Sequence, residues 1–267
     1  MNFIDTIAIL LLVTALLMVI TLYISWNMPW ITGYWRPRVF GYSFRNLRKI
    51  MIVSDVHLWK SKGVNNIGRI VREKNIDVVI VAGDLFDEPI EISSTRTIVE
   101  ALKRAINAMD LHNTRLVFIP SRSFHDFRAL FTKPLFFKYR DIDIVVIPDI
   151  AVFKIDRCND YIVVTHGDYA FRSGVIAFLL DIMGIKLFGR LPTGELLRKL
   201  YSLGRNVWLV YGHSHIGYID YSRKIINTGC WKPMELLKVI KISSSIRGIT
   251  IYCNSYGYLE IAPITTI

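Results

Sequence analysis

Charge is missing from the start of this chain. No charged residue lies between Asp5 and Arg36, and residues 7–24 are almost wholly aliphatic. A helix rises about 1.5 Å per residue, so this run is long enough to cross a hydrocarbon layer of roughly 30 Å. A cleaved signal peptide, the alternative, would have a basic start, a shorter apolar stretch and small residues at the cleavage point. The sequence therefore favours an uncleaved membrane anchor over residues 1–35.

The residues that flank this run predict its orientation. Basic residues such as Arg36 and Arg38 follow it, whereas none precedes it. Because positive charge stays on the cytoplasmic side of membranes, we predict a single-pass protein whose remaining residues, 36–267, form one cytoplasmic domain. The net charge of +11 suits anionic headgroups and equally suits nucleic acid. Aromatic residues typical of a membrane interface also follow the run: Tyr23, Trp26, Trp30, Tyr34 and Trp35.

Cysteine is scarce. Cys158, Cys230 and Cys253 lie far apart in the sequence and form no CxxC pair. This usage predicts neither a disulfide framework nor a structural zinc site, and it agrees with a reducing compartment. We interpret all three as small core residues.

Proline is also sparse, and no internal repeat or low-complexity tract divides the remaining chain. Helices are predicted over 66–74 and 94–109, and an apolar helical insert over about 169–205 suggests burial or contact with lipid or an apolar substrate. Strands alternate with helices early and follow one another late, which predicts two packed sheets with helices outside. The expected strands are 49–54, 77–82, 116–119, 144–147, 151–155, 161–165, 207–211, 224–227, 237–242, 248–253 and 257–261.

Five of the six histidines lie in short motifs that each follow or adjoin an apolar run. Carboxylates and imidazoles at strand ends are the ligands that a pair of divalent ions needs. Each motif alone is a weak signal, but their order makes the set strong. His112, between a helix and a strand, is interpreted as a non-ligand. The motifs are Asp55-Val-His57, Gly83-Asp84-Leu-Phe-Asp87, Phe124-His125-Asp126, His166-Gly-Asp168 and Gly212-His213-Ser-His215.

This set resembles the calcineurin-like metallophosphoesterase superfamily, whose pattern is DxH, GDxxD, GNH(D/E), a lone His and GHxH. The resemblance extends from about Lys49 to Trp231 and includes Asn227-Thr-Gly229. It implies a mixed α/β (α+β) fold, a four-layer αββα sandwich, with a dinuclear centre of Mn, Fe or Zn at the strand ends. The metal ligands that it implies are Asp55, His57, Asp84 and His215 for one ion, and Asp84, His166 and His213 for the other.

The resemblance also implies roles for residues around the metals. His125 would act as a general acid or orient the substrate phosphate, with Asp126 beside it as a second catalytic residue. Asp87 and Asn227 would support the ligands. The reaction implied is hydrolysis of a phosphate ester or anhydride by attack of a metal-bound hydroxide.

The third motif departs from the family pattern. This chain reads Pro120-Ser-Arg-Ser-Phe-His-Asp126 where the family reads Pro-Gly-Asn-His-Asp. Either Phe124 replaces the metal-binding Asn, or Ser121-Arg122 aligns with Gly-Asn and two residues are inserted. Ser121 or Ser123 could offer a weak oxygen ligand, or water could take that place. We therefore expect the second metal to bind more weakly than the first.

The apolar insert after His166 is placed as in UDP-2,3-diacylglucosamine hydrolases, a branch that this chain loosely resembles. With the predicted anchor, it favours a phosphodiester or pyrophosphate bond in a lipid or nucleotide-lipid substrate. Two other functions stay open. One is a nuclease that acts on nucleic-acid backbone, and the other is a metal-binding scaffold that has lost catalysis.

Overall fold

The computed structural model describes residues 3–33, 36–42, 47–58, 63–91, 94–122, 125–127, 133–156, 158–231, 234–236, 240–242 and 244–265. The side chains of residues 3–10, 234–236 and 240–242 are not among those described. Tyr34 and Trp35 of the predicted aromatic belt lie outside these ranges, and so do Ser123 and Phe124 of the third motif.

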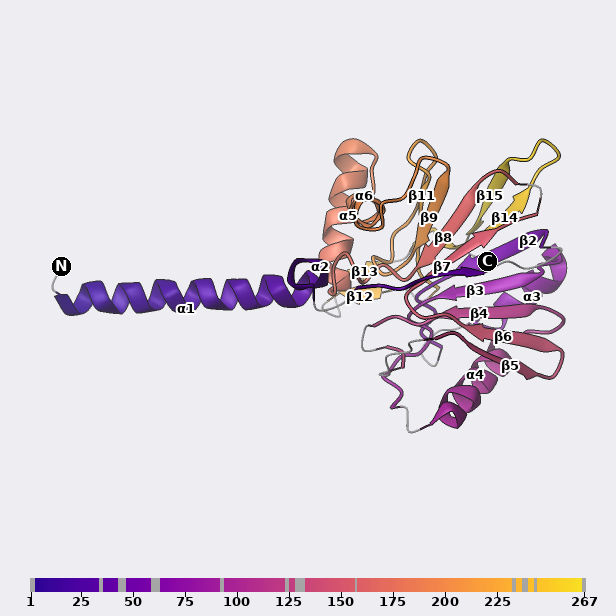
Figure 1. Ribbon diagram of the computed structural model, residues 1–267, viewed down its shortest axis with the longest axis horizontal. Coiled ribbons are helices and arrows are strands. Elements are labelled where there is room, and N and C mark those ends of the chain that lie inside the picture. Colours follow the sequence, from indigo (N-terminus) through magenta and orange to yellow (C-terminus); the bar gives the residue numbers. More distant parts are fainter. Residues whose placement is uncertain are drawn as a thin grey trace.

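Two β-sheets face one another at the centre of the domain (Figure 1). The first sheet has the order β15-β14-β2-β3-β4-β6-β5, and the second has the order β1-β7-β8-β9-β11-β10. In the first sheet the strands are β2 (Lys49–Val53), β3 (Val78–Ala82), β4 (Arg115–Ile119), β5 (Leu135–Tyr139), β6 (Ile142–Val146), β14 (Ile246–Cys253) and β15 (Leu259–Thr265). In the second they are β1 (Val39–Tyr42), β7 (Ile150–Lys154), β8 (Tyr161–Thr165), β9 (Val207–Tyr211), β10 (Gly217–Asp220) and β11 (Ile225–Thr228).

Helices cover the outer face of each sheet and complete four layers. Alternate residues of β2 and β3 point to opposite faces, so Val53 packs towards α3 (Asn66–Lys74) and α4 (Thr95–Met109), while Ile52 packs between the sheets. On the far side, α5 (Gly174–Phe188) and α6 (Pro192–Leu200) cover the second sheet. The predicted mixed α/β fold with two packed sheets is confirmed.

Parallel pairing brings the carboxyl ends of several strands to one edge. Strands β2, β3 and β4 run parallel in the first sheet, as β8, β9 and β11 do in the second. The segments that follow these strands carry the Asp and His motifs, so the topology gathers them where the two sheets meet.

The strands absent from the prediction are edge strands. β1 and β10 end the second sheet, and β5 ends the first. Their residues are mostly half-exposed, in alternation for β1 and β5, and their apolar residues are interrupted by glycine, lysine or aspartate, which makes these strands harder to predict. Of the strand predicted over 237–242, residues 240–242 form β13 (Ile240–Ile242), which pairs antiparallel with β12 (Met234–Leu236), and residues 237–239 lie outside the described ranges.

Helix α1 (Phe3–Asn27) projects away from the domain (Figure 1). Its described large apolar side chains, from Leu11 to Trp26, are between 39% and 71% exposed. Among the described side chains, which begin at residue 11, no helix is both long and apolar enough to cross a membrane, so the expected transmembrane helix is not found. The short helix α2 (Pro29–Thr32) links α1 to the domain.

Two of the three cysteines are bonded. Cys158, before β8, forms a disulfide with Cys253 at the end of β14, across 95 residues of sequence. The expectation of three free core cysteines is therefore wrong for this pair, while Cys230 is free and buried. Because disulfides are rare in reducing compartments, the cysteine usage no longer supports such a compartment.

Candidate active site

Most of the predicted metal ligands have an unusual backbone. A positive φ is uncommon outside glycine because the Cβ atom crowds the carbonyl oxygen. Such residues gather at functional sites, where the surrounding structure holds them in place. Of the twelve such residues that the structure describes, five lie in the segments that follow β2, β3 and β9 and belong to the predicted ligands. The residues are Asp55 (φ 50°), His57 (47°), Asp84 (49°), His213 (69°) and His215 (58°).

Glycines let these segments approach closely. A Cβ atom on Gly83 would lie 2.3 Å from Nδ1 of His166, and one on Gly212 would lie 2.2 Å from Oγ of Ser54. No side chain fits at either distance, so glycine at both positions is what allows the motifs to meet.

Asp55, His57 and His215 form the first ligand group. One ligand atom from each lies within 4.8 Å of the others. Oδ2 of Asp55 accepts hydrogen bonds from Oγ of Ser54 at 2.5 Å and from the backbone N–H of His213 at 3.0 Å. Among the described residues, its buried Oδ1 accepts no hydrogen bond and lies 3.2 Å from Nε2 of His215. A buried carboxylate oxygen without a donor fits a cation at that point.

Asp55, Asp84 and His166 form the second ligand group, which shares Asp55 with the first. Nδ1 of His166 lies 3.0 Å from the carbonyl oxygen of Ala82, and Nε2 of His213 lies 2.7 Å from that of Phe171. A carbonyl only accepts, so these nitrogens carry the protons. The other two nitrogens, Nε2 of His166 and Nδ1 of His213, then face each other 3.1 Å apart. Carbonyl groups often fix the tautomers of metal-binding histidines in this way.

Charges in the cluster suit metal binding. Burial lowers the pKa of His57 to about 4, and burial with the charge of His166 lowers the pKa of His213 to about 4, so both imidazoles are neutral near pH 7. Burial alone would lower the pKa of His166, but the carboxylates of Asp84 and Asp168 outweigh it and raise the pKa to about 9. This raised pKa reports a negative potential that attracts cations.

Asp126 of the third motif lies next to Asp84, but its side chain does not face the cleft. The Asp126 carboxylate is fully buried. It accepts hydrogen bonds from the backbone N–H groups of Asp84 (2.8 Å), Leu85 (3.0 Å) and Ser121 (2.8 Å). Asp126 therefore positions the segment that carries Asp84.

In one of the two alignments, Ser121 and Arg122 correspond to the Gly and Asn of the family pattern. Oγ of Ser121 is 2.5 Å from Oδ1 of Asp84 and so lies at the second ligand group. Arg122 turns away, with its guanidinium 2.8 Å from Oδ1 of Asp149 and its backbone N–H donated to Asp168 at 2.6 Å. Ser121 is thus the side chain of this pair that supplies an oxygen to the cluster.

The remaining predicted residues surround the ligands. Nδ1 of His125 lies 3.0 Å from the carbonyl oxygen of Asp87, and the His125 ring meets the His57 ring edge-on with centroids 4.9 Å apart. Asn227 donates from Nδ2 to the carbonyl oxygen of Gly212 at 3.0 Å, which supports the segment before His213. Nε2 of His112, the histidine outside the motifs, lies 3.2 Å from Oδ1 of Asp110.

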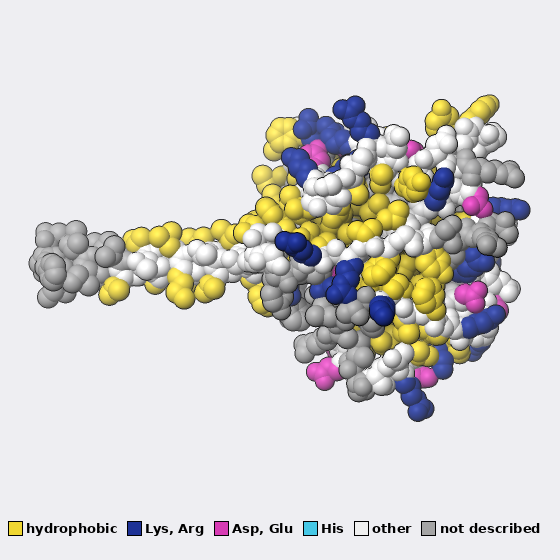
Figure 2. All heavy atoms as spheres, viewed as in Figure 1, with side chains coloured by type: hydrophobic (Ala, Val, Ile, Leu, Met, Phe, Trp, Pro, Cys, Tyr) yellow, Lys and Arg dark blue, Asp and Glu magenta, His cyan; other side chains and the backbone are white. Residues whose placement is uncertain are grey.

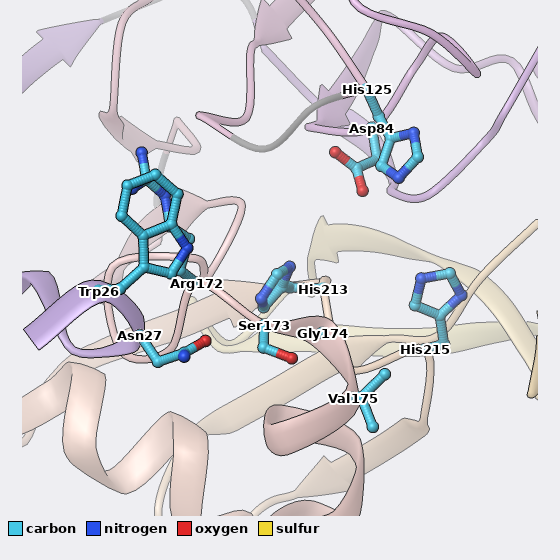
Figure 3. Close-up of a pocket in the computed structure, with 10 residues that line it drawn as sticks. All are labelled: Trp26, Asn27, Asp84, His125, Arg172, Ser173, Gly174, Val175, His213 and His215. Atoms are coloured by element: carbon cyan, nitrogen blue, oxygen red, sulfur yellow. The ribbon is translucent and has the colours of Figure 1, made fainter. Parts of the chain in front are cut away.

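A cleft of about 360 Å³ opens over the cluster (Figure 3). Asp84, His125, His213 and His215 line one part of it. The rest of the lining could not be predicted from local patterns, because it comes from the end of α1 and the loop before α5, which are distant in the chain. Those residues are Trp26, Asn27, Arg172, Ser173, Gly174 and Val175.

A family model described as calcineurin-like phosphoesterase matches residues 48–248. The match covers most of the chain, and the chain belongs to this family. The resemblance inferred from the motifs is thereby confirmed. Members of the family bind divalent metals, and the donor sets described above fit such ions.

Solved structures with a related fold share little sequence with this chain. A single-substitution variant of Vps29 from Entamoeba histolytica is 11% identical, with 82% of this chain and 99% of that chain covered and a TM-score of 0.40. A predicted phosphoesterase from Streptococcus pneumoniae is 14% identical, with 81% and 98% covered and a TM-score of 0.36. GAP50, the anchor in the inner membrane complex of Plasmodium, is 9% identical, with 82% and 90% covered and a TM-score of 0.32. No curated protein matches this chain significantly.

Proposed function

We propose that this protein is a metal-dependent phosphoesterase that hydrolyses a phosphodiester or pyrophosphate bond. The observation that carries the proposal is the convergence of carboxylate oxygens and imidazole nitrogens on two overlapping centres at the floor of the cleft. Asp55, His57 and His215 would hold one divalent ion, and His166 with His213 would hold a second. Asp84 would bridge them.

The residues of the chain have separate tasks in this proposal. Divalent ions supply Lewis-acid stabilisation of the phosphoryl oxygens and activate water as a nucleophile. His125 lies in the cleft with Nδ1 hydrogen-bonded to the carbonyl of Asp87, so its Nε2 can hold a proton for the departing oxygen. Asp126 keeps the backbone of Asp84 in place.

Unequal metal affinity is part of the proposal. The family Asn aligns with Phe124 or Arg122, and the oxygen that lies beside Asp84 is instead the neutral hydroxyl of Ser121, which already contacts Asp84 and Asp126. A hydroxyl is a weaker ligand than a carboxamide oxygen, so the second ion should bind less tightly than the first.

We further propose that the substrate is amphiphilic and that the protein works at a membrane. The basic residues after α1, such as Arg36 and Arg38, favour a cytoplasmic domain, whereas the Cys158–Cys253 disulfide counts against it. Apolar side chains continue from α1 onto the adjoining face of the domain, with Lys and Arg side chains among them (Figure 2). Helix α5 starts near the end of α1 and runs away from it at a steep angle (Figure 1). It carries exposed apolar side chains, the first of which, Val175, lines the cleft. If α1 enters a bilayer, these side chains face the lipid surface. They are Val175, Leu179, Met183, Leu187 and Phe188.

Hydrolysis of bis(p-nitrophenyl) phosphate by the full chain in detergent, with Mn²⁺, tests the enzyme proposal. We expect turnover by the wild type and by His112→Asn, a control outside the cluster, and none by Asp84→Asn. A folded, metal-supplied wild type without turnover on this and other phosphoesters would refute it. That outcome would favour a scaffold, to which the altered third motif already gives some support.

Extraction of membranes with alkaline carbonate tests the membrane proposal. We expect the full chain to stay with the lipid, and a Leu12→Asp, Leu16→Asp double variant to be released because charge in the apolar run is costly in lipid. Release of the wild type would contradict it. Protection of the domain from protease added outside intact cells tests the cytoplasmic side.

A further inference from the structure

The loop between β8 and α5 is fastened to the end of α1. The backbone N–H of Arg172 donates to the carbonyl oxygen of Asn27 at 2.8 Å, and Nε1 of Trp30 donates to the carbonyl oxygen of Ala170 at 3.0 Å. The guanidinium carbon of Arg172 lies 4.2 Å from the centroid of the Trp26 ring. These contacts make one wall of the cleft from two distant parts of the chain.

The charge of Arg172 is not neutralised within that wall. Among the residues that the structure describes, its recorded partners are the Trp26 ring and the Asn27 carbonyl, and neither is a carboxylate. Arg122 differs, because its guanidinium pairs with Asp149. A guanidinium that is stacked on an indole ring is held in orientation while its N–H groups remain available to a ligand.

Arg172 and the metal cluster lie at different ends of the cleft. Figure 3 shows Arg172 stacked with Trp26 on one side, Asp84, His125 and His215 on the other, and His213 between them. A cavity of about 360 Å³ is large enough for more than one phosphoryl group. An anionic group that reaches Arg172 is therefore distinct from the phosphoryl group that reacts at the metals.

We propose that Arg172, held by Trp26, binds a second phosphoryl group of the substrate and so selects compounds that contain a diphosphate. The inference rests on the proposed phosphoesterase function and narrows its substrate class to pyrophosphate bonds. It also makes the last turn of α1 part of the substrate site. Arg172 is a specificity residue here, because its planar fork of donors matches two phosphoryl oxygens.

Binding of two simple anions to the full chain in detergent tests the proposal directly. The probes are inorganic pyrophosphate and inorganic orthophosphate, with affinities measured by calorimetry in the presence of Mn²⁺. In the Arg172→Gln variant we expect the affinity for pyrophosphate to fall about tenfold or more and that for orthophosphate to change by less than about threefold. Arg190→Gln is the matched control, because Arg190 lies after α5 and outside the cleft lining.

A second variant covers the case in which Arg172→Gln does not fold. Trp26→Leu keeps an apolar side chain but removes the indole face, and we expect it to weaken pyrophosphate binding about threefold. Unchanged pyrophosphate affinity in both variants, or an equal loss for both anions, would overturn the proposal. Absence of pyrophosphate binding by the wild type would overturn it as well.

The binding measurement separates the two proposals. Arg172-dependent pyrophosphate binding without any hydrolysis would uphold the second phosphoryl site and refute the enzyme. Hydrolysis of bis(p-nitrophenyl) phosphate together with a pyrophosphate affinity that is unchanged in Arg172→Gln would uphold the enzyme and refute this site.

Discussion

The two ligand groups of the cluster differ in how many hydrogen bonds their carboxylate oxygens already accept from the protein. Around Asp55, Oδ2 is hydrogen-bonded and the buried Oδ1 has no donor among the described residues. Around Asp84, Oδ1 is already 2.5 Å from the Ser121 hydroxyl. The first group is therefore ready for a cation, whereas the second must give up or share a hydrogen bond. This contrast predicts that the ions bind in sequence rather than together.

The largest expected effect comes from Asp84, the carboxylate that would bridge the two metals in the proposed function. We expect Asp84→Asn to lower turnover about a thousandfold or more, because several kcal/mol of transition-state stabilisation depend on both ions. Steady-state hydrolysis and metal content should be measured on the same preparation. An Asp84→Asn enzyme that kept its turnover would show that catalysis does not depend on Asp84 or on the ions that it would bridge.

The difference between the two ligand groups is tested by adding a carboxamide oxygen at Ser121. We expect Ser121→Asn to raise the affinity of the weaker metal site about tenfold or more, since it adds a carboxamide oxygen beside Asp84. Titration of the metal-free protein with Mn²⁺ should show two unequal sites in the wild type and more nearly equal ones in the variant. Ser121→Ala is the control that removes the hydroxyl without adding a ligand. Two wild-type sites of equal affinity would contradict the predicted difference between the two ligand groups.

Asp126 provides a more moderate test, because it acts on Asp84 through the backbone. In Asp126→Asn one acceptor oxygen is replaced by an N–H₂ group that cannot accept the N–H of Asp84 or Ser121. We expect a loss of about 1–3 kcal/mol in the free energy of unfolding and weaker binding at the second site. Denaturant unfolding measures the first effect. A loss of turnover with unchanged stability and metal affinity would instead point to a direct catalytic role.

The smallest effect is expected at His112, the histidine outside the motifs. His112→Asn should leave turnover, metal affinity and thermal midpoint nearly unchanged, because His112 is substantially exposed and pairs only with Asp110 among the described residues. Any sizeable change in metal affinity would mean that the cluster extends beyond the strand-end motifs.

Local patterns were sufficient for much of the fold and of the cluster. A buried strand such as β3 has a continuous apolar run, and Asp84 follows it directly, so its position could be predicted from neighbours in sequence. Edge strands such as β5 have no such run. The Cys158–Cys253 bond and the Arg172–Trp26 stack join segments that meet only after the sheets and α1 have packed. Pairings of this kind leave no local signal.

The left-handed backbone of the metal-ligand segments has a consequence for how this chain could change over time. Each such position outside glycine costs roughly 1–2 kcal/mol, and His57, His213 and His215 all occupy it. Random drift without selection for a bound cation would replace these histidines with glycine or asparagine and make the fold easier to form. The proposed metal chemistry therefore requires side chains that lower the stability of the segments that carry them.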